Sequence, residues 1–457
     1  MESEDLSRRV FLGSVAAAAG AALSCRYLPA RRGAKAGEGG RTPNVIYILA
    51  DDLGYGDIEP YGQEKINTPS LRRMAREGMK LTDHYCGTSV CAPSRCSLLT
   101  GKHMGHAEIT GNGQGPLSAG EVTIAEVMKQ AGYATGCAGK WGLGGPGSSG
   151  HPNEQGFDHF FGFLNQTRAH RYYPEFVWRN DQKVELEGNH GKTGEQYVHD
   201  LFTEESLNFI RAHAGGPFFW YLPYTIPHAD VIVPEDSMAP YRGRFPEEPQ
   251  EDGYYVGQPT PNAARAGMIS RMDRDVGRIL DLLVELGIEK DTLVIFSSDN
   301  GPCPAGGQDF RFFDSTGPLS GAKRQLKEGG IRVPTIAWWP GTIPAGSVSG
   351  HVSAFWDVLP TCAELAGVTP PPNDGVSMLP PLSGNPARQP EHEYLYWTFR
   401  NKAAVRFGNW KYIQVDGRPE LYNLAEDLAE QNNLADARPD VVRRAKRYMG
   451  AAAQPLT

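Results

Sequence analysis

The sequence predicts an α/β protein with a doubly wound, mostly parallel sheet flanked by helices, followed by a smaller C-terminal antiparallel sheet with a helix. Residues 44–50 and 292–298 are short, continuous apolar runs, which are typical of strands buried on both faces of a parallel sheet. Helical patterns alternate with such runs, as they do in doubly wound folds. The alternation stops at the Pro-rich residues 369–373, and from about Tyr394 apolar and polar residues alternate. That period of two predicts antiparallel strands.

Four helices are expected between and after these strands, besides a short one within residues 91–101. Thr68 is the expected N-cap of the first, with Pro69 in its first turn, and Thr123 and Glu126 have the spacing of a capping box at the second. The third is the longest amphipathic segment, and we expect its charged residues to form a solvated face. The predicted helices are residues 68–79, 123–132, 262–286 and 439–451.

Two pairs of oxygen-bearing residues follow the two apolar runs. Asp51 and Asp52 end the first run, and Asp299 and Asn300 end the second. Two acids at the end of a buried strand are costly unless they are paired. Their ligand atoms are hard oxygens without sulfur or imidazole, and this set selects calcium or magnesium over zinc.

Two further predicted strands also lead to polar residues. Residues 133–138 lead to Lys140, and residues 217–222 lead through a short loop to His228. Ligands of doubly wound sheets bind beyond the carboxyl ends of the strands. We therefore expect all four strand ends to meet in one site.

The segment from Cys91 to Gly101 is the candidate reactive centre. Pro93 suits the first position of a helix that stops at Gly101, so Cys91 should lie just before the helix N-terminus. The partial positive charge there favours anions and lowers the pKa of a thiol, and Arg95 adds a cation. An anionic group is therefore expected beside Cys91.

This segment, Cys91-Ala-Pro-Ser-Arg95 and then Leu-Leu-Thr-Gly101, resembles the maturation signature of the type I sulfatases. These are the formylglycine-dependent, arylsulfatase-like enzymes of the alkaline phosphatase superfamily. The resemblance extends from about Pro43 to Leu434. It implies that a maturation enzyme oxidises Cys91 to formylglycine. It also implies that calcium, rather than magnesium, is bound by Asp51, Asp52, Asp299, Asn300 and the formylglycine at residue 91.

The same resemblance implies hydrolysis of sulfate esters. One hydroxyl of the hydrated formylglycine would attack sulfur and expel an alcohol, and the other would then expel sulfate and restore the aldehyde. Arg95, Lys140 and Lys323 would neutralise the sulfuryl oxygens, and His228 would protonate the leaving oxygen or hold the sulfate. Lys323 is assigned because residues 321–334 resemble the family's second lysine segment, with its Glu-Gly-Gly.

The chain departs from the family pattern at Gly142. The family usually reads Gly-Lys-Trp-His-Leu-Gly, whereas residues 139–144 read Gly-Lys-Trp-Gly-Leu-Gly. We expect His170, or a water molecule, to take the place of the missing imidazole. His170 belongs to a cationic cluster with Arg168 and Arg171, which we interpret as a pocket for a second anionic group on a sulfated sugar.

Composition excludes some classes of protein. The 45 Lys and Arg residues are outnumbered by 53 Asp and Glu residues, and the net charge of −8 disfavours a nucleic-acid-binding protein.

Residues 1–41 are predicted to be a twin-arginine export signal and linker, with Arg8 and Arg9 before an apolar run too short to span a membrane. No transmembrane helix is expected, and the location should be periplasmic or extracellular. A lipoprotein anchored at Cys25 is the alternative.

The rest of the chain divides into a catalytic α/β domain, residues 42–385, and a C-terminal α+β subdomain, residues 386–457. The leading prediction is an exported, calcium-dependent sulfatase that acts on sulfated carbohydrate or another sulfate ester. A phosphodiester or phosphonate ester hydrolase is an alternative, because tetrahedral phosphorus suits the same scaffold and nucleophile. A glycan-binding protein without turnover is another, motivated by Gly142.

Overall fold

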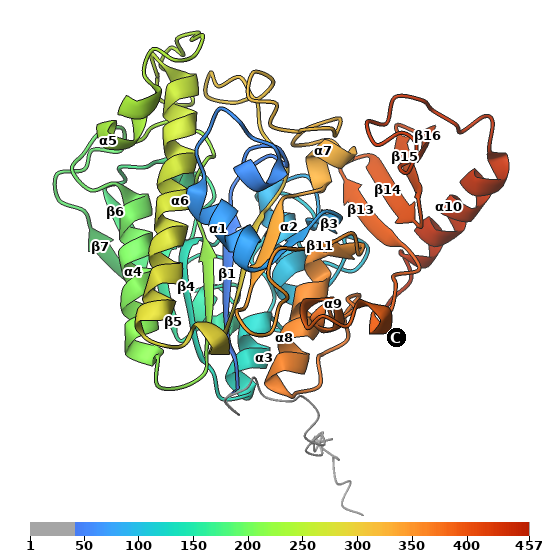
Figure 1. The fold of residues 1–457 in the computed structure, drawn as a ribbon, viewed down its shortest axis with the longest axis horizontal. Helices are drawn as coiled ribbons and strands as arrows, with labels where there is room; N and C mark the ends of the chain where they lie inside the picture. Colours follow the sequence, from blue (N-terminus) through green and yellow to red (C-terminus); the bar gives the residue numbers. More distant parts are fainter. Residues whose placement is uncertain (1–41, 457) are drawn as a thin grey trace, which may run out of the picture. The chain divides into compact units, whose positions relative to one another are not determined.

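The computed structural model describes residues 42–456, and the predicted export signal with Arg8, Arg9 and Cys25 lies outside the described residues. Ten strands form one large sheet in the order β11-β2-β10-β9-β1-β8-β4-β5-β6-β7 (Figure 1). Its strands are β1 (Asn44–Ala50), β2 (Met79–Leu81), β4 (Ala134–Lys140), β5 (His159–Phe163), β6 (Phe176–Arg179), β7 (Gln182–Glu185), β8 (Phe218–Pro223), β9 (Thr292–Ser298), β10 (Thr335–Trp338) and β11 (Ser347–Ser349).

The centre of this sheet is parallel. β1 pairs with β9 and β8, β8 pairs with β4, and β4 pairs with β5, all in parallel register. Towards the two sides of the sheet the pairing becomes antiparallel: β10 pairs so with β9 and β2, and β6 with β5 and β7. β11 runs parallel to β2. A short second sheet pairs β3 (His84–Tyr85) with β12 (Ser353–Ala354). β1 and β9 have the bounds predicted from the two apolar runs.

Helices cover both faces of the large sheet. On one face Ile46 and Ile48 of β1 pack with helices α1 (Pro69–Glu77), α4 (Val198–His213) and α6 (Pro261–Glu285). On the other face Val45 and Tyr47 pack with α2 (Cys91–Thr100), α3 (Ile124–Gln130) and α8 (Val358–Ala366). Figure 1 shows α4 and α6 side by side across one face. The predicted doubly wound α/β fold is therefore confirmed.

Only some of the charged residues of α6 form the solvated face that we expected, with Arg274, Asp281 and Glu285 exposed. Arg265, Asp273 and Asp275 are buried, because partners from other parts of the chain surround them. Arg265 pairs with Asp57, and the carboxylate of Asp275 lies 3.1 Å from His199 Nε2. These charges therefore join α6 to its neighbours instead of facing solvent.

The N-terminus of α1 is capped from outside the helix. Thr68 is the N-cap residue, as predicted, but its side chain makes no capping hydrogen bond. The Asp273 carboxylate of α6 accepts hydrogen bonds from the backbone N–H groups of Ser70 (3.0 Å) and Leu71 (2.7 Å) in its place. The predicted capping box that begins at Thr123 is confirmed.

The C-terminal part forms the predicted antiparallel sheet. Its strands β13 (Leu395–Phe399), β14 (Lys402–Phe407), β15 (Trp410–Val415) and β16 (Arg418–Asn423) pair in sequence order, and α10 (Pro439–Ala451) has the predicted bounds (Figure 1). One face packs on α10, while Trp397 and Ile413 on the other join the core of the large sheet. At this junction Lys411 lies between the carboxylates of Glu328 (2.8 Å) and Glu430 (3.0 Å), all three being buried.

The remaining helices are short. They are α5 (Glu235–Met238), α7 (Glu328–Ile331) and α9 (Leu379–Leu382), with the 3-10 helices η1 (Glu59–Tyr61), η2 (Pro152–Gln155), η3 (Arg168–His170), η4 (Ala239–Tyr241), η5 (Glu289–Asp291), η6 (Phe355–Asp357) and η7 (Pro386–Arg388). Within residues 42–456 no helix combines the length and the apolar character needed to cross a membrane.

Candidate active site

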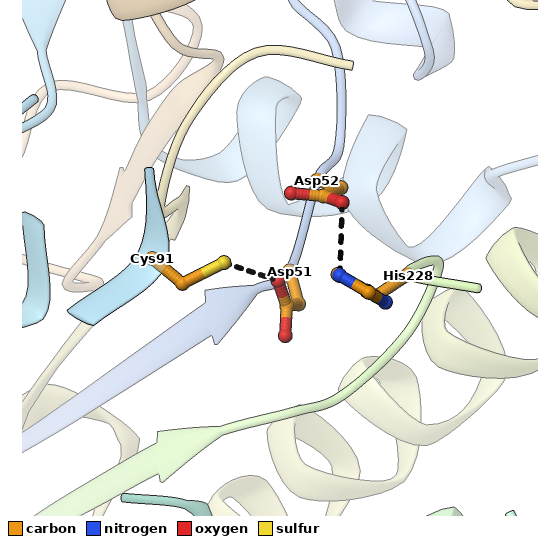
Figure 2. Close-up of side chains that lie close together, drawn as sticks. All are labelled: Asp51, Asp52, Cys91 and His228. Carbon is orange, nitrogen blue, oxygen red and sulfur yellow. Dashed lines mark hydrogen bonds and ion pairs between the residues drawn. The ribbon is translucent and has the colours of Figure 1, made fainter. Parts of the chain in front are cut away.

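The four polar strand ends meet at the carboxyl edge of the parallel strands. β9, β1, β8 and β4 are neighbours in the sheet, so the residues that follow them come together. Figure 2 shows the side chains of Asp51, Asp52, Cys91 and His228 around one point, with Cys91 facing Asp51 and His228 facing Asp52. The residues that the strands bring together are Asp51 and Asp52 after β1, Asp299 and Asn300 after β9, Lys140 at the end of β4 and His228 after β8.

Asp51 is held by two cations. It accepts a hydrogen bond from Lys140 Nζ (2.5 Å), and Arg95 Nη2 lies 3.4 Å from the same carboxylate oxygen. Burial alone would raise the pKa of Asp51, but Lys140, His228 and Arg95 together hold it well below its ordinary value. Asp51 is therefore ionised at neutral pH.

Asp52 and Asp299 have cationic partners as well. Lys323 Nζ lies 2.6 Å from Asp52 Oδ1, and Asn300 Nδ2 donates to the same oxygen (2.7 Å). Arg95 donates to Asp299 from both Nε (3.1 Å) and Nη2 (2.8 Å). Burial and a neighbouring carboxylate raise the pKa of Asp299 to about 6, against the effect of Arg95. Three carboxylates thus face three cations, and their formal charges balance.

Cys91 is the first residue of α2, and only 1% of it is exposed. Its Sγ lies 3.3 Å from Asp51 Oδ1 and 3.4 Å from Lys323 Nζ. The helix thus begins at Cys91, whereas we had expected Cys91 to lie just before the first helical residue. The expectation of a lowered thiol pKa is also wrong, because burial, then Asp299 and Asp51, raise the pKa of Cys91 well above its ordinary value. The charge of Arg95 is directed to Asp299 and not to the sulfur.

The carboxylate cluster can hold a metal ion. One ligand atom from each of Asp51, Asp52, Cys91 and His228 lies within 4.8 Å of the others, a group that includes His228 and does not include Asp299. Asn300 Oδ1 is buried and has no hydrogen-bond partner within the described residues. A buried oxygen without a partner is costly, and a hard cation would supply one. The donors therefore fit calcium or another hard divalent cation.

A cavity of about 1220 Å³ opens over the cluster. Cys91, His228 and Lys323 line it, whereas Arg95 and Lys140 are fully buried and are not among its lining residues. No Asp or Glu is among the described residues that line it, although the protein carries a net charge of −8. The cavity therefore suits an anionic ligand.

Two cations that the sequence analysis did not single out also line the cavity. Lys183 Nζ lies over the rings of Phe176 (4.7 Å) and Trp178 (5.8 Å). Arg324 follows Lys323 directly, and that adjacency is a signal that could have identified it. The hairpin of β6 and β7 carries no motif, so nothing in the sequence pointed to Lys183.

The predicted cluster of Arg168, His170 and Arg171 is divided by the structure. Arg168 and His170 line the cavity. The His170 ring stacks on His228 with 4.1 Å between ring centres, and burial, then His228, lower the pKa of His170 to about 2. Arg171 is not among the lining residues and donates to both carboxylate oxygens of Asp230 (3.0 and 2.7 Å).

The side chain of Gln166 lies beside Gly142. That His170 or a water molecule takes the place of the missing imidazole stays a prediction. A Cβ atom built on Gly142 would lie 2.3 Å from Gln166 Nε2, and the three heavy atoms nearest to it all belong to that side chain. Gln166 follows β5 and lines the cavity. No pattern in the sequence distinguishes this glutamine.

Known proteins resemble this chain over most of its length. The family model described as Sulfatase matches residues 43–368, and the model described as N-sulphoglucosamine sulphohydrolase, C-terminal, matches residues 318–449. The N-acetylgalactosamine-6-sulfatase of Canis lupus familiaris is 32% identical over 406 residues, which cover 81% of this chain and 71% of that protein. The N-acetylgalactosamine-6-O-sulfatase of Bacteroides thetaiotaomicron is 28% identical over 492 residues and covers 89% and 92% of the two chains.

Solved structures show the same fold. The crystal structure described as Ps i-CgsB in complex with k-i-k-neocarrahexaose has a TM-score of 0.78 and 26% identity, and it covers 91% of this chain and 94% of that chain. The Sulfatase family model alone matches more than half of the present chain. The chain therefore belongs to the type I sulfatases of the alkaline phosphatase superfamily, and it is a sulfuric ester hydrolase.

Proposed function

We propose that this protein removes sulfate from sulfated carbohydrate by means of a formylglycine made from Cys91 and a bound calcium ion. One observation carries the proposal: Cys91 lies where the carboxylate cluster meets a cavity that is lined by cations and, among its described residues, by no carboxylate. The names of the relatives, N-acetylgalactosamine-6-sulfatase among them, support carbohydrate as the substrate class.

The buried cations prepare the carboxylates as ligands. Lys140 and Arg95 keep Asp51 and Asp299 in place, so in this proposal they act through those carboxylates and do not touch the sulfuryl oxygens. When bound, calcium would lower the pKa of a hydroxyl of the hydrated formylglycine, and the deprotonated hydroxyl could then attack the sulfur of a sulfate ester. The residues that would hold the calcium are Asp51, Asp52, Asp299, Asn300 and residue 91.

Lys323 and His228 face the reacting group from the cavity. Lys323 Nζ contacts both Asp52 and Cys91 Sγ, so its charge lies close enough to neutralise a sulfuryl oxygen bound beside residue 91. His228 Nδ1 is oriented by the carbonyl oxygen of Ala229. This leaves Nε2 on the side of Asp52. Burial lowers the pKa of His228 to about 4, so His228 would have to take up a proton before Nε2 could hold the sulfate or protonate the leaving oxygen.

The outer cavity suits a second anionic group on the sugar. The guanidinium of Arg168 lies 4.1 Å from the centre of the Phe176 ring, and Lys183 lies over the same ring, so one aromatic side chain positions two cations. We propose that these cations and His170 bind a neighbouring carboxylate or sulfate. Arg171 would act indirectly, because it does not line the cavity and its guanidinium pairs with Asp230.

The mass of the tryptic peptide of residues 81–95 tests the nucleophile, in protein made by a host that matures a known sulfatase. The peptide contains Cys86 as well as Cys91. After conversion of Cys91 only one thiol remains for alkylation, whereas the unconverted peptide has two. An intact thiol at residue 91 in such a host would contradict the enzymatic mechanism and favour glycan binding without turnover.

Paired sulfate and phosphorus esters test the class of reaction. The protein should release sulfate from sulfated saccharides faster than it cleaves the matching phosphate and phosphonate esters, and Cys91→Ala should abolish both activities. Faster cleavage of the phosphorus esters would favour the alternative hydrolase. Lys183→Gln should lower kcat/KM for a saccharide with a second anionic group and leave a small aryl sulfate unaffected.

Export by the twin-arginine route, maturation by a separate enzyme and the division into residues 42–385 and 386–457 remain parts of this proposal. A fusion of residues 1–41 to a reporter protein, with Arg8 and Arg9 replaced by Lys as the control, tests the export route. Reporter that reaches the periplasm equally well with the lysine pair would contradict it.

A further inference from the structure

We propose that the side-chain amide of Gln166 binds the sulfuryl group of the substrate, at the place that Gly142 leaves without a side chain. The inference rests on the proposed sulfatase reaction and adds a residue to its active site. Two independent observations carry it, the contact between the two residues and the unpartnered amide nitrogen of Gln166.

The backbone at Gly142 makes room for the amide. Gly142 stands two residues beyond Lys140, which ends β4 and contacts Asp51. Its φ of +82° lies in the left-handed region, which favours glycine. A Cβ atom there would lie 2.3 Å from Gln166 Nε2, so the amide can occupy this place only because residue 142 has no side chain.

The amide nitrogen of Gln166 is buried and has no hydrogen-bond partner within residues 42–456. Buried donors without partners are rare in proteins, because each has lost its water without gaining an acceptor. Gln166 lines the same cavity as Cys91, His228 and Lys323. Because the nitrogen atom itself is buried, the side chain would have to turn it towards a ligand in that cavity to gain the missing acceptor.

A sulfate ester has the chemistry that this donor needs. Its sulfuryl oxygens are anionic acceptors, and the described residues of the cavity lining include no carboxylate that could compete for the amide. Hydrogen bonds to ionised acceptors are shorter and stronger than those between neutral groups. Unlike an imidazole, the amide is uncharged, so its hydrogen bond would be made equally at every working pH.

Replacement of the amide tests the proposal directly. Gln166→Leu removes the donor at similar size, and Gln166→Glu adds a negative charge. Losing a hydrogen bond to a charged group should lower the affinity for inorganic sulfate, and kcat/KM for a small aryl sulfate, roughly ten- to hundredfold, with a larger loss for Gln166→Glu. Because the small ester has no sugar, an effect there locates the contact at the sulfuryl group.

Gln114 provides a matched control. It lines the same cavity, but its amide already bonds to Thr110, accepting from the backbone N–H (2.7 Å) and donating to the hydroxyl (3.2 Å). Gln114→Leu should therefore leave sulfate affinity and turnover of the aryl sulfate within about twofold of the wild type.

A double-mutant cycle separates direct binding from a general structural role. Gly142→Ala should displace the amide and lower sulfate affinity in the wild-type background. In a Gln166→Ala background the same change should have a smaller effect, limited to the strain of an alanine at positive φ, because no amide remains to be displaced. Additive losses from the two substitutions would overturn the inference.

Sulfate affinity measured by calorimetry on the whole protein tests Gln166 even in protein that turns over no ester. Sulfate binding that depends on Gln166, without any ester cleavage, would contradict the proposed function and support this inference. Equal affinity in the wild type, Gln166→Leu and Gln114→Leu would overturn it. If Gln166→Leu fails to fold, Gly142→Ala makes the same test from the other side of the contact.

Discussion

Lys411→Met removes the cation between two buried carboxylates at the junction of the two sheets. Lys411 Nζ lies 2.8 Å from Glu328 and 3.0 Å from Glu430, and its side chain is fully buried. Burial alone would raise the pKa of Glu328, but Lys411, with Arg332 and Arg406, holds it at about 2. Without Lys411, the two carboxylates face each other in the interior with one cation fewer.

The expected loss follows from this burial. Removing one partner of a buried ion pair costs about 3–5 kcal/mol, because the other charge stays in a medium that solvates it poorly. With an unfolding entropy of about 2.1 cal/mol/K per residue, the folded part, residues 42–456, should lose roughly 3 to 6 °C of melting temperature. Met fills a volume similar to that of Lys, so most of the lost stability should come from the missing charge and not from a cavity.

Thermal unfolding followed by circular dichroism measures this loss. Lys446→Met on the exposed side of α10 is the matched control and should change stability by less than about 0.5 kcal/mol. Adding Glu430→Gln to Lys411→Met should recover part of the loss, since it removes one of the unpaired charges. A Lys411→Met protein that melts together with the control would refute the reasoning.

Three further outcomes are expected. Asp275→Asn should cost about 3 kcal/mol by urea unfolding, because the buried carboxylate that pairs with Arg274 and lies beside His199 loses its charge, and an unchanged midpoint would contradict that role. Burial lowers the pKa of His84 from 6.5 to about 4. The contribution of His84 to the free energy of unfolding is therefore complete above pH 6.5 and is lost as the pH falls towards 4. His84→Gln should flatten that dependence of melting temperature on pH, whereas the exposed His190→Gln should not. Calcium at 100 times its dissociation constant should stabilise the protein by about 2.7 kcal/mol and so raise its melting temperature. A chelator should reverse this increase, and Asp299→Ala should abolish it.

The strand ends of the active site could be predicted because their signals are local. A continuous apolar run that stops at two acids, as residues 44–50 stop at Asp51 and Asp52, is typical of a buried parallel strand that leads into a polar site. The fold then brings such ends together by a general rule of parallel sheets. The central strands and the capping box of α3 were predictable for the same reason.

The parts that could not be predicted depend on partners that are distant in the sequence. The charges of α6 looked solvated because an amphipathic pattern does not show that Asp273 meets the start of α1 or that Asp275 meets His199. The raised pKa of Cys91 depends on where Arg95 points, which helix position alone does not determine. Gln166 has no motif, and only the missing side chain at Gly142 indicated that something else fills that place.

The burial of α2 bears on whether the proposed oxidation of Cys91 could come before or after folding. All ten residues of the helix are buried, and Cys91 is its first. A small ester can reach residue 91 through the cavity, whereas a maturation enzyme that binds the surrounding segment in extended form would need α2 to leave the core. If Cys91 is oxidised as we propose, that step would come before folding is complete. If the chain is also exported in folded form as we propose, the oxidation would take place in the compartment of synthesis, and chains that fold first would keep their thiol.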